Sequence, residues 1–443
     1  FCLSRGLGDV YKRQGATRAD LDALVSRHER IPALEQHQLI ERHPDINEVR
    51  EWWVALPEPE RRRMEHDAAL LIGNLDGLPW PARIRANHIT IDRILARFAD
   101  AAALQPWTPS GRRRLRMLRR TRPLPRRVRI LERLKQLHSG PGYFDRGDLP
   151  RFLIAFNPFT AGIVEYLGPS IRDTDDPYEL PYARGVRAVG LFVPGNESDL
   201  LQFEGKAHTM SEPVLLANNA AGGRVAGMIA WQGGRFPHGP EALLSTRVRE
   251  LAPLLVRFGE ALVRDESVRV TAFGFSFGGA VTGTALAQGL RVDQVVHLSS
   301  AGLGFGTRSV ADLPSHAQVP HISLMCPGDT SVGWIQRMRM RIPGIGEVGH
   351  GGSPIYDPGV TRLETGWLKA EADGGPPLTG HTTILEKWGT TAKHNMAAVL
   401  AGGDVELAAP RSLPYRVAER LGLPLTPITR PGYRPKRREW PAP

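Results

Sequence analysis

The stretch VRVTAFGFSFGGAVTGTALAQGL, residues 268–290, contains the local pattern that decides the fold. Its first part, VRVTAF at 268–273, is an apolar run of the kind that forms a buried strand. GFSFG at 274–278 fits the pattern G-x-S-x-G, and the residues after it are typical of a helix. A serine at such a strand-to-helix turn forms a nucleophile elbow, where larger neighbours would collide with the strand and the helix. The alternative is an ordinary glycine-rich turn.

Short apolar runs bounded by Gly, Pro and Asn alternate with helical patterns from about residue 150 onward. We expect strands at 152–156, 163–167, 187–193, 225–231, 268–273, 294–298 and 321–326. We expect helices at 241–265, 277–289 and 391–401. Strands that alternate with helices indicate an α/β fold, in which a mostly parallel sheet is covered by helices on both faces.

The chain before residue 150 has a different pattern, with apolar residues at helical spacing and no strand-like alternation. We expect helices near 21–39, across 49–73 and across 82–104. The sequence therefore predicts a helical N-terminal region ahead of the α/β domain.

These changes in composition divide the chain into four segments. We interpret residues 1–14 as a non-native leader, residues 15–149 as the helical region with an arginine-rich connector, and residues 150–408 as the α/β domain. The Pro- and Arg-rich residues 409–443 are expected to be an extended or disordered tail. Because we find neither a signal peptide nor 18 consecutive apolar residues, we expect no membrane span and a cytoplasmic location.

An elbow serine needs a base and a carboxylate that orients the base, and in this class of fold they follow in the order Ser, Asp or Glu, His. Asp329 comes directly after the strand expected at 321–326 and is the candidate acid, unless it only forms a PGD turn. His381 follows a long loop and precedes the last helical pattern, so we favour it as the base. His350 and His394 are the alternatives.

The oxyanion of the tetrahedral intermediate needs two main-chain N–H donors. One is the N–H of Phe277, the residue after the serine, at the beginning of a helix. The other is expected in the loop VPGNESD after the strand at 187–193, where Gly195 allows a close approach and Asn196 supplies the N–H. A plain Pro-Gly turn is the alternative for that loop.

The net charge of +11 first suggests a nucleic-acid partner, until it is located along the chain. Residues 110–135 contain eleven arginines and Lys135 against Glu132, so this run carries the whole excess. A phosphate backbone or an anionic surface could bind there. However, no aromatic residue interrupts the run to stack on bases, so we interpret it as a solvated, partly helical connector with no specific nucleic-acid partner.

The sequence favours no cofactor and no metal ion. The two cysteines, Cys2 and Cys326, exclude a disulfide framework and a zinc site made of cysteines. GLGFG at 302–306 lacks the full spacing of a dinucleotide loop and follows the sixth expected strand instead of the first. We find no H-E-x-x-H or comparable metal-binding spacing.

The chain resembles a family of actinobacterial α/β hydrolases that was first described as a domain of unknown function. The matching segments span about 49–403 and are WWVALPEPERRRM, LIGNLDGLPWPARIRAN, RFLIAFNP, AVGLFVPGN, GFSFGGAVTGTAL, VVHLSSAGLG and GHTTILEKWGTTAKHN. The resemblance implies a serine-hydrolase core behind a helical front region, with the nucleophile at Ser276, the histidine at His381 and the acid near Asp329. The family usually has His and Tyr on either side of the serine, where this chain has Phe275 and Phe277, so its elbow is more apolar.

These patterns predict a serine hydrolase that cleaves an ester, thioester or amide of a small acyl substrate through an acyl-enzyme. They name neither the substrate nor the oligomeric state. The competing interpretation is a non-catalytic protein that binds an anion or a partner through the arginine run and whose hydrolase fold is degenerate.

Overall fold

The computed structural model describes two compact units of the chain. The first comprises Phe1–Phe159 and Ile171–Pro181, and the second comprises Thr160–Ser170 and Tyr182–Pro443. The described residues are 15–103 except 28, 149–326 except 199, 346–366, 380–408 and 436–443, together with 129, 131–132, 135, 329, 332, 335–336, 340–342 and 378. The expected leader at 1–14 and most of the arginine-rich run at 110–135 therefore lie outside the described residues.

The first unit is mainly helical, and one fully buried pair of tryptophans lies in its core. Its helices are α1 (Arg18–Val25), α2 (Ala33–Glu41), α3 (Ile46–Ala55), α4 (Glu58–Asp67), α5 (Ala69–Asn74) and α6 (Trp80–Ala103). Trp52 and Trp53 of α3 are both inaccessible to solvent and belong to an apolar cluster to which all of these helices contribute. The helical pattern read from the sequence is thus the pattern of core-facing residues.

The segment expected as one helical stretch across 49–73 is divided into α3, α4 and α5. Leu56 has extended backbone dihedrals and precedes Pro57, because a residue before proline avoids the helical region. A second break follows at Ala68, which ends α4 and begins α5. The periodicity predicted helices here, and the local backbone restrictions decided their ends.

The first unit also contains the strand β1 (Arg151–Asn157) and the segment Ile171–Pro181. Asn74 and Asn87 donate side-chain hydrogen bonds to main-chain oxygens of β1, at 2.9 and 3.1 Å. Arg85 makes two 2.8 Å bonds to the buried carboxylate of Glu65 and one of 3.1 Å to Asp175. Buried amides and ion pairs thus hold β1 and the later segment against the helices.

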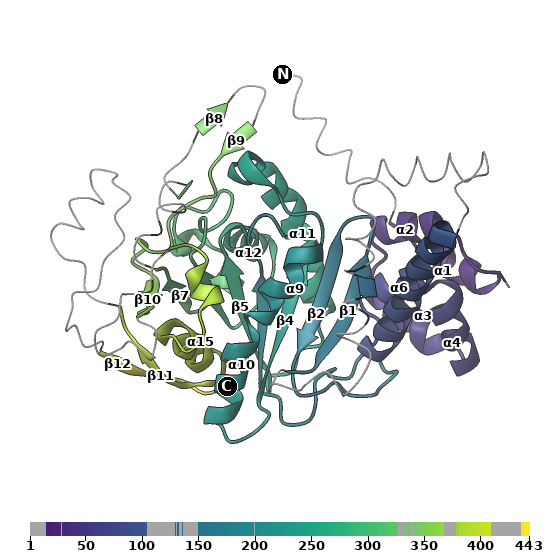
Figure 1. The fold of residues 1–443 in the computed structure, drawn as a ribbon, viewed down its shortest axis with the longest axis horizontal. Coiled ribbons are helices and arrows are strands. Elements are labelled where there is room, and N and C mark those ends of the chain that lie inside the picture. Colours follow the sequence, from purple (N-terminus) through teal and green to yellow (C-terminus); the bar gives the residue numbers. More distant parts are fainter. Residues whose placement is uncertain are drawn as a thin grey trace. The chain divides into compact units, whose positions relative to one another are not determined.

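One mostly parallel sheet forms the centre of the second unit. Within the described residues, seven of its strands follow the order β2-β4-β3-β5-β6-β7-β10. Their bounds are β2 (Gly162–Leu167), β3 (Ala188–Val193), β4 (Ala226–Gln232), β5 (Arg269–Phe275), β6 (Gln294–Leu298), β7 (His321–Leu324) and β10 (Val360–Arg362). Neighbours from β4 to β10 are parallel, and β2 is antiparallel to β4 (Figure 1). This confirms the predicted sheet.

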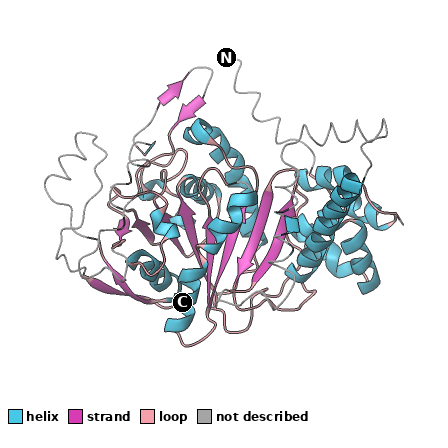
Figure 2. Ribbon diagram, viewed as in Figure 1, coloured by secondary structure: helices cyan, strands magenta, loops and turns pink. Residues whose placement is uncertain are grey.

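Helices cover both faces of this sheet. The longer ones are α9 (Leu200–His208), α10 (Ser211–Ala220), α11 (Ser245–Ala261), α12 (Phe277–Gln288) and α15 (Thr391–Ala401). Short helical turns are η2 (Gly239–Leu243), η3 (Val310–Asp312), η4 (Ser315–Ala317) and α14 (Thr383–Glu386). α11 packs on α12 and α10 on α15, and each pair contacts β3, whose residues are all buried. Figure 2 shows helices on both sides of the strands. A strand buried in this way is covered on both faces, as predicted.

Several elements of the second unit were not predicted. α9 and α10 contain glycine, asparagine and serine, which favour helices weakly, so their formation depends on packing. β10 and the strands of two small two-stranded sheets consist of three or four residues each, too few for a periodic signal. These sheets are β8 (Met340–Ile342) with β9 (Gly346–Val348), and β11 (Gly403–Glu406) with β12 (Arg437–Trp440).

The last residues of the chain are anchored on the second unit. β12 pairs antiparallel with β11, and Trp440 is 5% exposed. Its indole N–H donates to the side-chain oxygen of Gln294 at 3.0 Å, at the beginning of β6. Of the tail expected at 409–443, the structure therefore describes residues 436–443 as an ordered strand and its end, and residues 409–435 lie outside the described part.

The turn between β5 and α12 is closely packed against backbone. A Cβ atom on Gly278 would lie 2.2 Å from the carbonyl oxygens of Val193 and Pro194, and one on Gly274 would lie 2.6 Å from the Cα of Gly279. Both distances are far below van der Waals contact. Glycine at 278 therefore allows the loop after β3 to approach the turn, and glycine at 274 allows α12 to begin close to β5.

We expect Gly278→Ala to destabilise the protein by about 1–3 kcal/mol, because the methyl group must displace backbone that cannot rotate away. Gly205→Ala on α9 is the matched control. Its Cβ would meet no atom within 4 Å, so it should stabilise by about 0.5–1 kcal/mol. Denaturant unfolding of both variants measures the difference. Wild-type stability of Gly278→Ala would contradict the close approach.

Two stacked histidines lie buried on neighbouring strands. Nε2 of His297 on β6 is 3.0 Å from Nδ1 of His321 on β7, and Nε2 of His321 is 3.3 Å from the oxygen of Ala317. A carbonyl only accepts, so His321 donates from Nε2, its Nδ1 accepts, and His297 donates from its own Nε2. The Nδ1 of His297 is then a bare acceptor, in agreement with its lack of a hydrogen-bond partner among the described residues. Both rings are therefore neutral.

Burial lowers the pKa of His297 well below its ordinary value of 6.5, and burial also lowers the pKa of His321. Below pH 6.5 the histidines of the unfolded chain bind protons that the folded pair does not. The free energy of unfolding should therefore decrease as the pH is lowered, by up to about 1.4 kcal/mol per pH unit for each such proton. His297→Gln keeps a donor toward His321 and should weaken this fall between pH 7 and 5. Thermal unfolding at both pH values measures it, with the exposed His66→Gln as control. An unchanged slope would contradict the assignment.

Candidate active site

Ser276 lies at the junction of β5 and α12 with an unusual backbone conformation. Its φ and ψ are 53° and −123°, and positive φ is uncommon for a residue other than glycine. Its N–H donates to the oxygen of Leu298 on β6 at 3.0 Å, and its oxygen accepts the N–H of Ala301 at 2.8 Å. The neighbouring strand thus holds the strained turn, and the geometry is that of a nucleophile elbow.

The three side chains expected to act together are within hydrogen-bond distance. Nε2 of His381 is 2.8 Å from Oγ of Ser276, and Nδ1 of His381 is 2.8 Å from Oδ2 of Asp329. A carboxylate accepts only, so Nδ1 carries the proton, and Nε2 is free to accept the proton of the serine hydroxyl. His381 is thereby placed as a base toward Ser276 and oriented by Asp329.

Asp329 follows β7 and is 1% exposed. Its other carboxylate oxygen accepts the N–H of Val332 at 3.4 Å. Cys326, just before it, is fully buried, and burial raises the pKa of its thiol to about 12. Cys326 therefore stays a neutral thiol and does not compete as a nucleophile.

The two alternative histidines are placed elsewhere. His350 is fully buried, its Nε2 is 2.7 Å from the oxygen of Ala242, and burial lowers the pKa of its imidazole. Its ring meets the ring of Phe277 edge-on, with centroids 5.5 Å apart. His394 lies half-buried on α15. Neither is bonded to Ser276 in the part of the chain that the structure describes.

The ring of Phe275 packs against the imidazole of His381. The two rings stack, with centroids 5.0 Å apart and planes inclined by 28°. The sequence showed only that Phe275 makes the elbow apolar. Residues 275 and 381 are too far apart along the chain for any periodic pattern to reveal their contact.

The segments that carry the two expected oxyanion donors both lie close to Ser276. Phe277 is the first residue of α12, and a Cβ on Gly195 would lie 3.0 Å from the Cβ of Ser276, so the loop after β3 passes directly beside the serine. Within the described residues, the N–H groups of Phe277 and Asn196 donate no hydrogen bond. Both are therefore available to an oxygen bound at the serine.

Two buried charged side chains, Glu212 and Lys393, support the segment after His381. Oε1 of Glu212 on α10 accepts the N–H of Gly389 at 2.6 Å, and the ammonium of Lys393 on α15 donates to the oxygen of Thr209. Burial lowers the pKa of Lys393 to about 8, against the attraction of Glu212, while burial raises the pKa of Glu212. This connection of two side chain–main chain hydrogen bonds joins the beginning of α10 to the beginning of α15. Nothing in the sequence indicated it, because the two helices are far apart in the chain.

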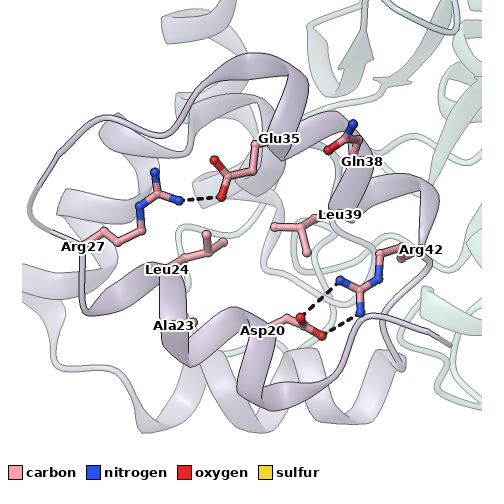
Figure 3. A pocket seen from close by; sticks show the side chains of 8 residues that line it. All are labelled: Asp20, Ala23, Leu24, Arg27, Glu35, Gln38, Leu39 and Arg42. Atoms are coloured by element: carbon pink, nitrogen blue, oxygen red, sulfur yellow. Dashed lines mark hydrogen bonds and ion pairs between the residues drawn. The ribbon is translucent and has the colours of Figure 1, made fainter.

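A separate cavity of about 290 Å³ lies within the first unit, between α1 and α2 (Figure 3). Leu24 and Leu39 form an apolar part of its wall. Arg27 pairs with Glu35 at 2.5 Å, and Arg42 pairs with Asp20 at 2.9 Å. Each of these four charges is already neutralised by its partner, so we assign no ligand to this cavity.

Two kinds of feature are absent from the described residues. No helix there is both long and apolar enough to cross a membrane. No group of three His, Cys, Asp or Glu side chains gathers closely enough there to hold a metal ion.

Comparison with known proteins supports the fold seen here. Residues 184–323 match a family model described as alpha/beta hydrolase. The fold is that of an α/β hydrolase. The matched segment includes Ser276 and the loop after β3, whereas Asp329 and His381 lie beyond it.

The curated proteins and the solved structures do not add to the evidence for the fold. No curated protein matches the chain. A solved structure titled "m3DLH" is 18% identical, with 38% of this chain and 64% of that chain covered and a TM-score of 0.24. A similarity this low carries no argument about fold or function.

We expect His381→Ala to lower kcat on an ester by about 10²–10⁴-fold, because the hydroxyl of Ser276 would lose its proton acceptor. His394→Gln is the matched control and should remain within about 3-fold of wild type, since no role in proton transfer is expected of it. Steady-state hydrolysis of p-nitrophenyl esters measures both. A large loss in the control with normal activity of His381→Ala would move the base to His394.

Proposed function

We propose that the protein is a serine hydrolase that cleaves an ester, thioester or amide of a small acyl substrate through an acyl-enzyme intermediate. The observation that carries the proposal is the chain of two 2.8 Å contacts from Asp329 through His381 to Ser276, at an elbow with strained backbone. Such a chain activates a hydroxyl that is otherwise a weak nucleophile.

In the first half of the reaction, Oγ of Ser276 attacks the substrate carbonyl carbon while Nε2 of His381 accepts the hydroxyl proton. Asp329 keeps the imidazole in the required tautomer and stabilises the cation that forms. The N–H groups of Phe277 and Asn196 bind the negative oxygen of the tetrahedral intermediate. His381 then gives its proton to the leaving group, and the acyl group remains on Ser276.

In the second half, a water molecule gives a proton to His381 and attacks the acyl-enzyme, which releases the acid and restores the serine hydroxyl. An alcohol or amine in place of water would make the same site an acyltransferase. The stacked Phe275 and the buried Phe277 provide apolar surroundings that favour an acyl chain over a charged substrate.

The proposal also covers the location, the partners and the relatives of the protein. We propose a cytoplasmic enzyme without a specific nucleic-acid partner, related to the actinobacterial hydrolases that the sequence resembles. The support for that relation is that the similar segments extend beyond residues 184–323 on both sides. From the sequence alone, we propose that the arginine-rich run at 110–135 connects the two parts of the chain and binds no specific nucleic acid.

The test is labelling with a fluorophosphonate together with ester hydrolysis. We expect the wild type to react, and Ser276→Ala to lose the label and about 10³-fold or more of its kcat while it unfolds at a similar temperature. Ser267→Ala is the matched control, because Ser267 is exposed in a loop, and it should react like the wild type.

A folded wild type that takes no label would support the non-catalytic alternative, in which the hydrolase fold is degenerate. Normal hydrolysis by a folded Ser276→Ala would show that another group carries the chemistry. A series of p-nitrophenyl esters of increasing chain length then identifies the preferred acyl group.

A further inference from the structure

The loop between β3 and α9 is held by a lysine and a serine that no sequence pattern indicated. The ammonium of Lys206 on α9 donates to the oxygen of Asn196 and to Oγ of Ser198, each at 2.7 Å. Oγ of Ser198 is in turn 2.6 Å from the oxygen of Gly195. Ser198 is 2% exposed, so this arrangement is shielded from competing water.

The direction of each proton in this arrangement follows from the chemistry of the groups. An ammonium only donates, so Lys206 occupies an acceptor position on the hydroxyl of Ser198. A carbonyl oxygen only accepts, so the hydroxyl of Ser198 donates its proton to Gly195. Lys206 therefore donates to Ser198, and Ser198 donates to the carbonyl oxygen of the Gly195–Asn196 peptide.

That same peptide carries the N–H of Asn196. In a trans peptide the C=O and the N–H point in opposite directions, so fixing the oxygen fixes the direction of the N–H. A Cβ on Gly195 would lie 3.0 Å from the Cβ of Ser276, so the residue that carries this oxygen lies directly beside the nucleophile. A proton donated to the carbonyl oxygen also polarises the amide and makes its N–H a stronger donor.

The rest of the loop is held in the same way. Glu197 has a φ of 56°, uncommon for a residue other than glycine, and its N–H donates to the oxygen of Pro237 at 2.8 Å. Lys206 holds the oxygen of Asn196 on the other side. A strained turn kept in place by several bonds is typical of functional loops.

We propose that Lys206, acting through Ser198, is a positioning residue that aims and polarises the N–H of Asn196 as an oxyanion donor; this rests on the proposed serine-hydrolase function. Neither side chain touches the reacting atoms. Their effect is expected mainly in the transition state, when the substrate oxygen becomes negative, and not in substrate binding.

The first experiment compares Lys206→Met with the wild type on a p-nitrophenyl ester. The variant keeps the length of the side chain but loses its charge and its donors, so kcat should fall by about 10- to 100-fold while KM stays within about 3-fold. Lys436→Met is the matched control, because Lys436 is exposed and distant in sequence from the loop, and it should behave like the wild type.

A chemically restored lysine-like side chain at position 206 distinguishes the loss of a positioning contact from a general loss of structure. Lys206→Cys treated with 2-bromoethylamine gains a thioether analogue of lysine and should recover most of its kcat. Treated wild type and treated Lys206→Met control for modification elsewhere. Failure to recover activity in a folded, fully modified variant would overturn the proposal.

The link through Ser198 is tested by combining variants. If Lys206 acts on the carbonyl of Gly195 through Ser198, the double variant Lys206→Met with Ser198→Ala should lose no more than the worse single variant. Losses that multiply would show that Lys206 acts independently, and would overturn the proposal. A wild type that neither hydrolyses esters nor reacts with fluorophosphonate fails the proposed function itself, whereas an active wild type with a fully active Lys206→Met fails only this inference.

Discussion

The strained backbone of Ser276 is the constraint on which the site depends. Its φ of 53° places the hydroxyl at the end of the strand instead of within it, and no L-residue adopts this conformation without support. Here the support is backbone hydrogen bonding to the strand β6 and the following loop. It also requires Gly274 and Gly278, since any larger side chain would meet main-chain atoms. The sheet must therefore be formed before the serine is correctly placed.

The other parts of the site come from loops, and buried polar contacts hold these loops. Asp329 follows β7, His381 precedes α15, and the expected oxyanion loop follows β3. Apolar packing is not directional and cannot orient a carbonyl or an imidazole, whereas a hydrogen bond in a shielded position can. Lys206, with its donor chain to the loop, and Glu212, with its bond to the segment before α15, supply that direction.

Two neutral, buried histidines also fix how neighbouring strands lie against each other. The paired rings of His297 and His321 satisfy each other only in one arrangement of protons, which links β6 to β7. Because Asp329 follows β7, the same two strands that carry this pair also determine where the acid lies. Polar groups inside the sheet are costly unless matched, and such matching selects one register among several that apolar packing would allow.

The sequence by itself determined the α/β sheet and the turn at Ser276, because strand and helix periodicities are local and the turn needs glycine at fixed places. Strand β5 and the helices α12 and α15 agree with their expected ranges for this reason. Only the tertiary structure separated His381 from the two other histidines, since the distance between side chains 105 residues apart depends on how the loops pack. It alone revealed the stacking of Phe275 on His381 and the contacts of Lys206. Those contacts join residues whose spacing in the chain carries no periodic signal, so their geometry exists only once the sheet and its loops are assembled.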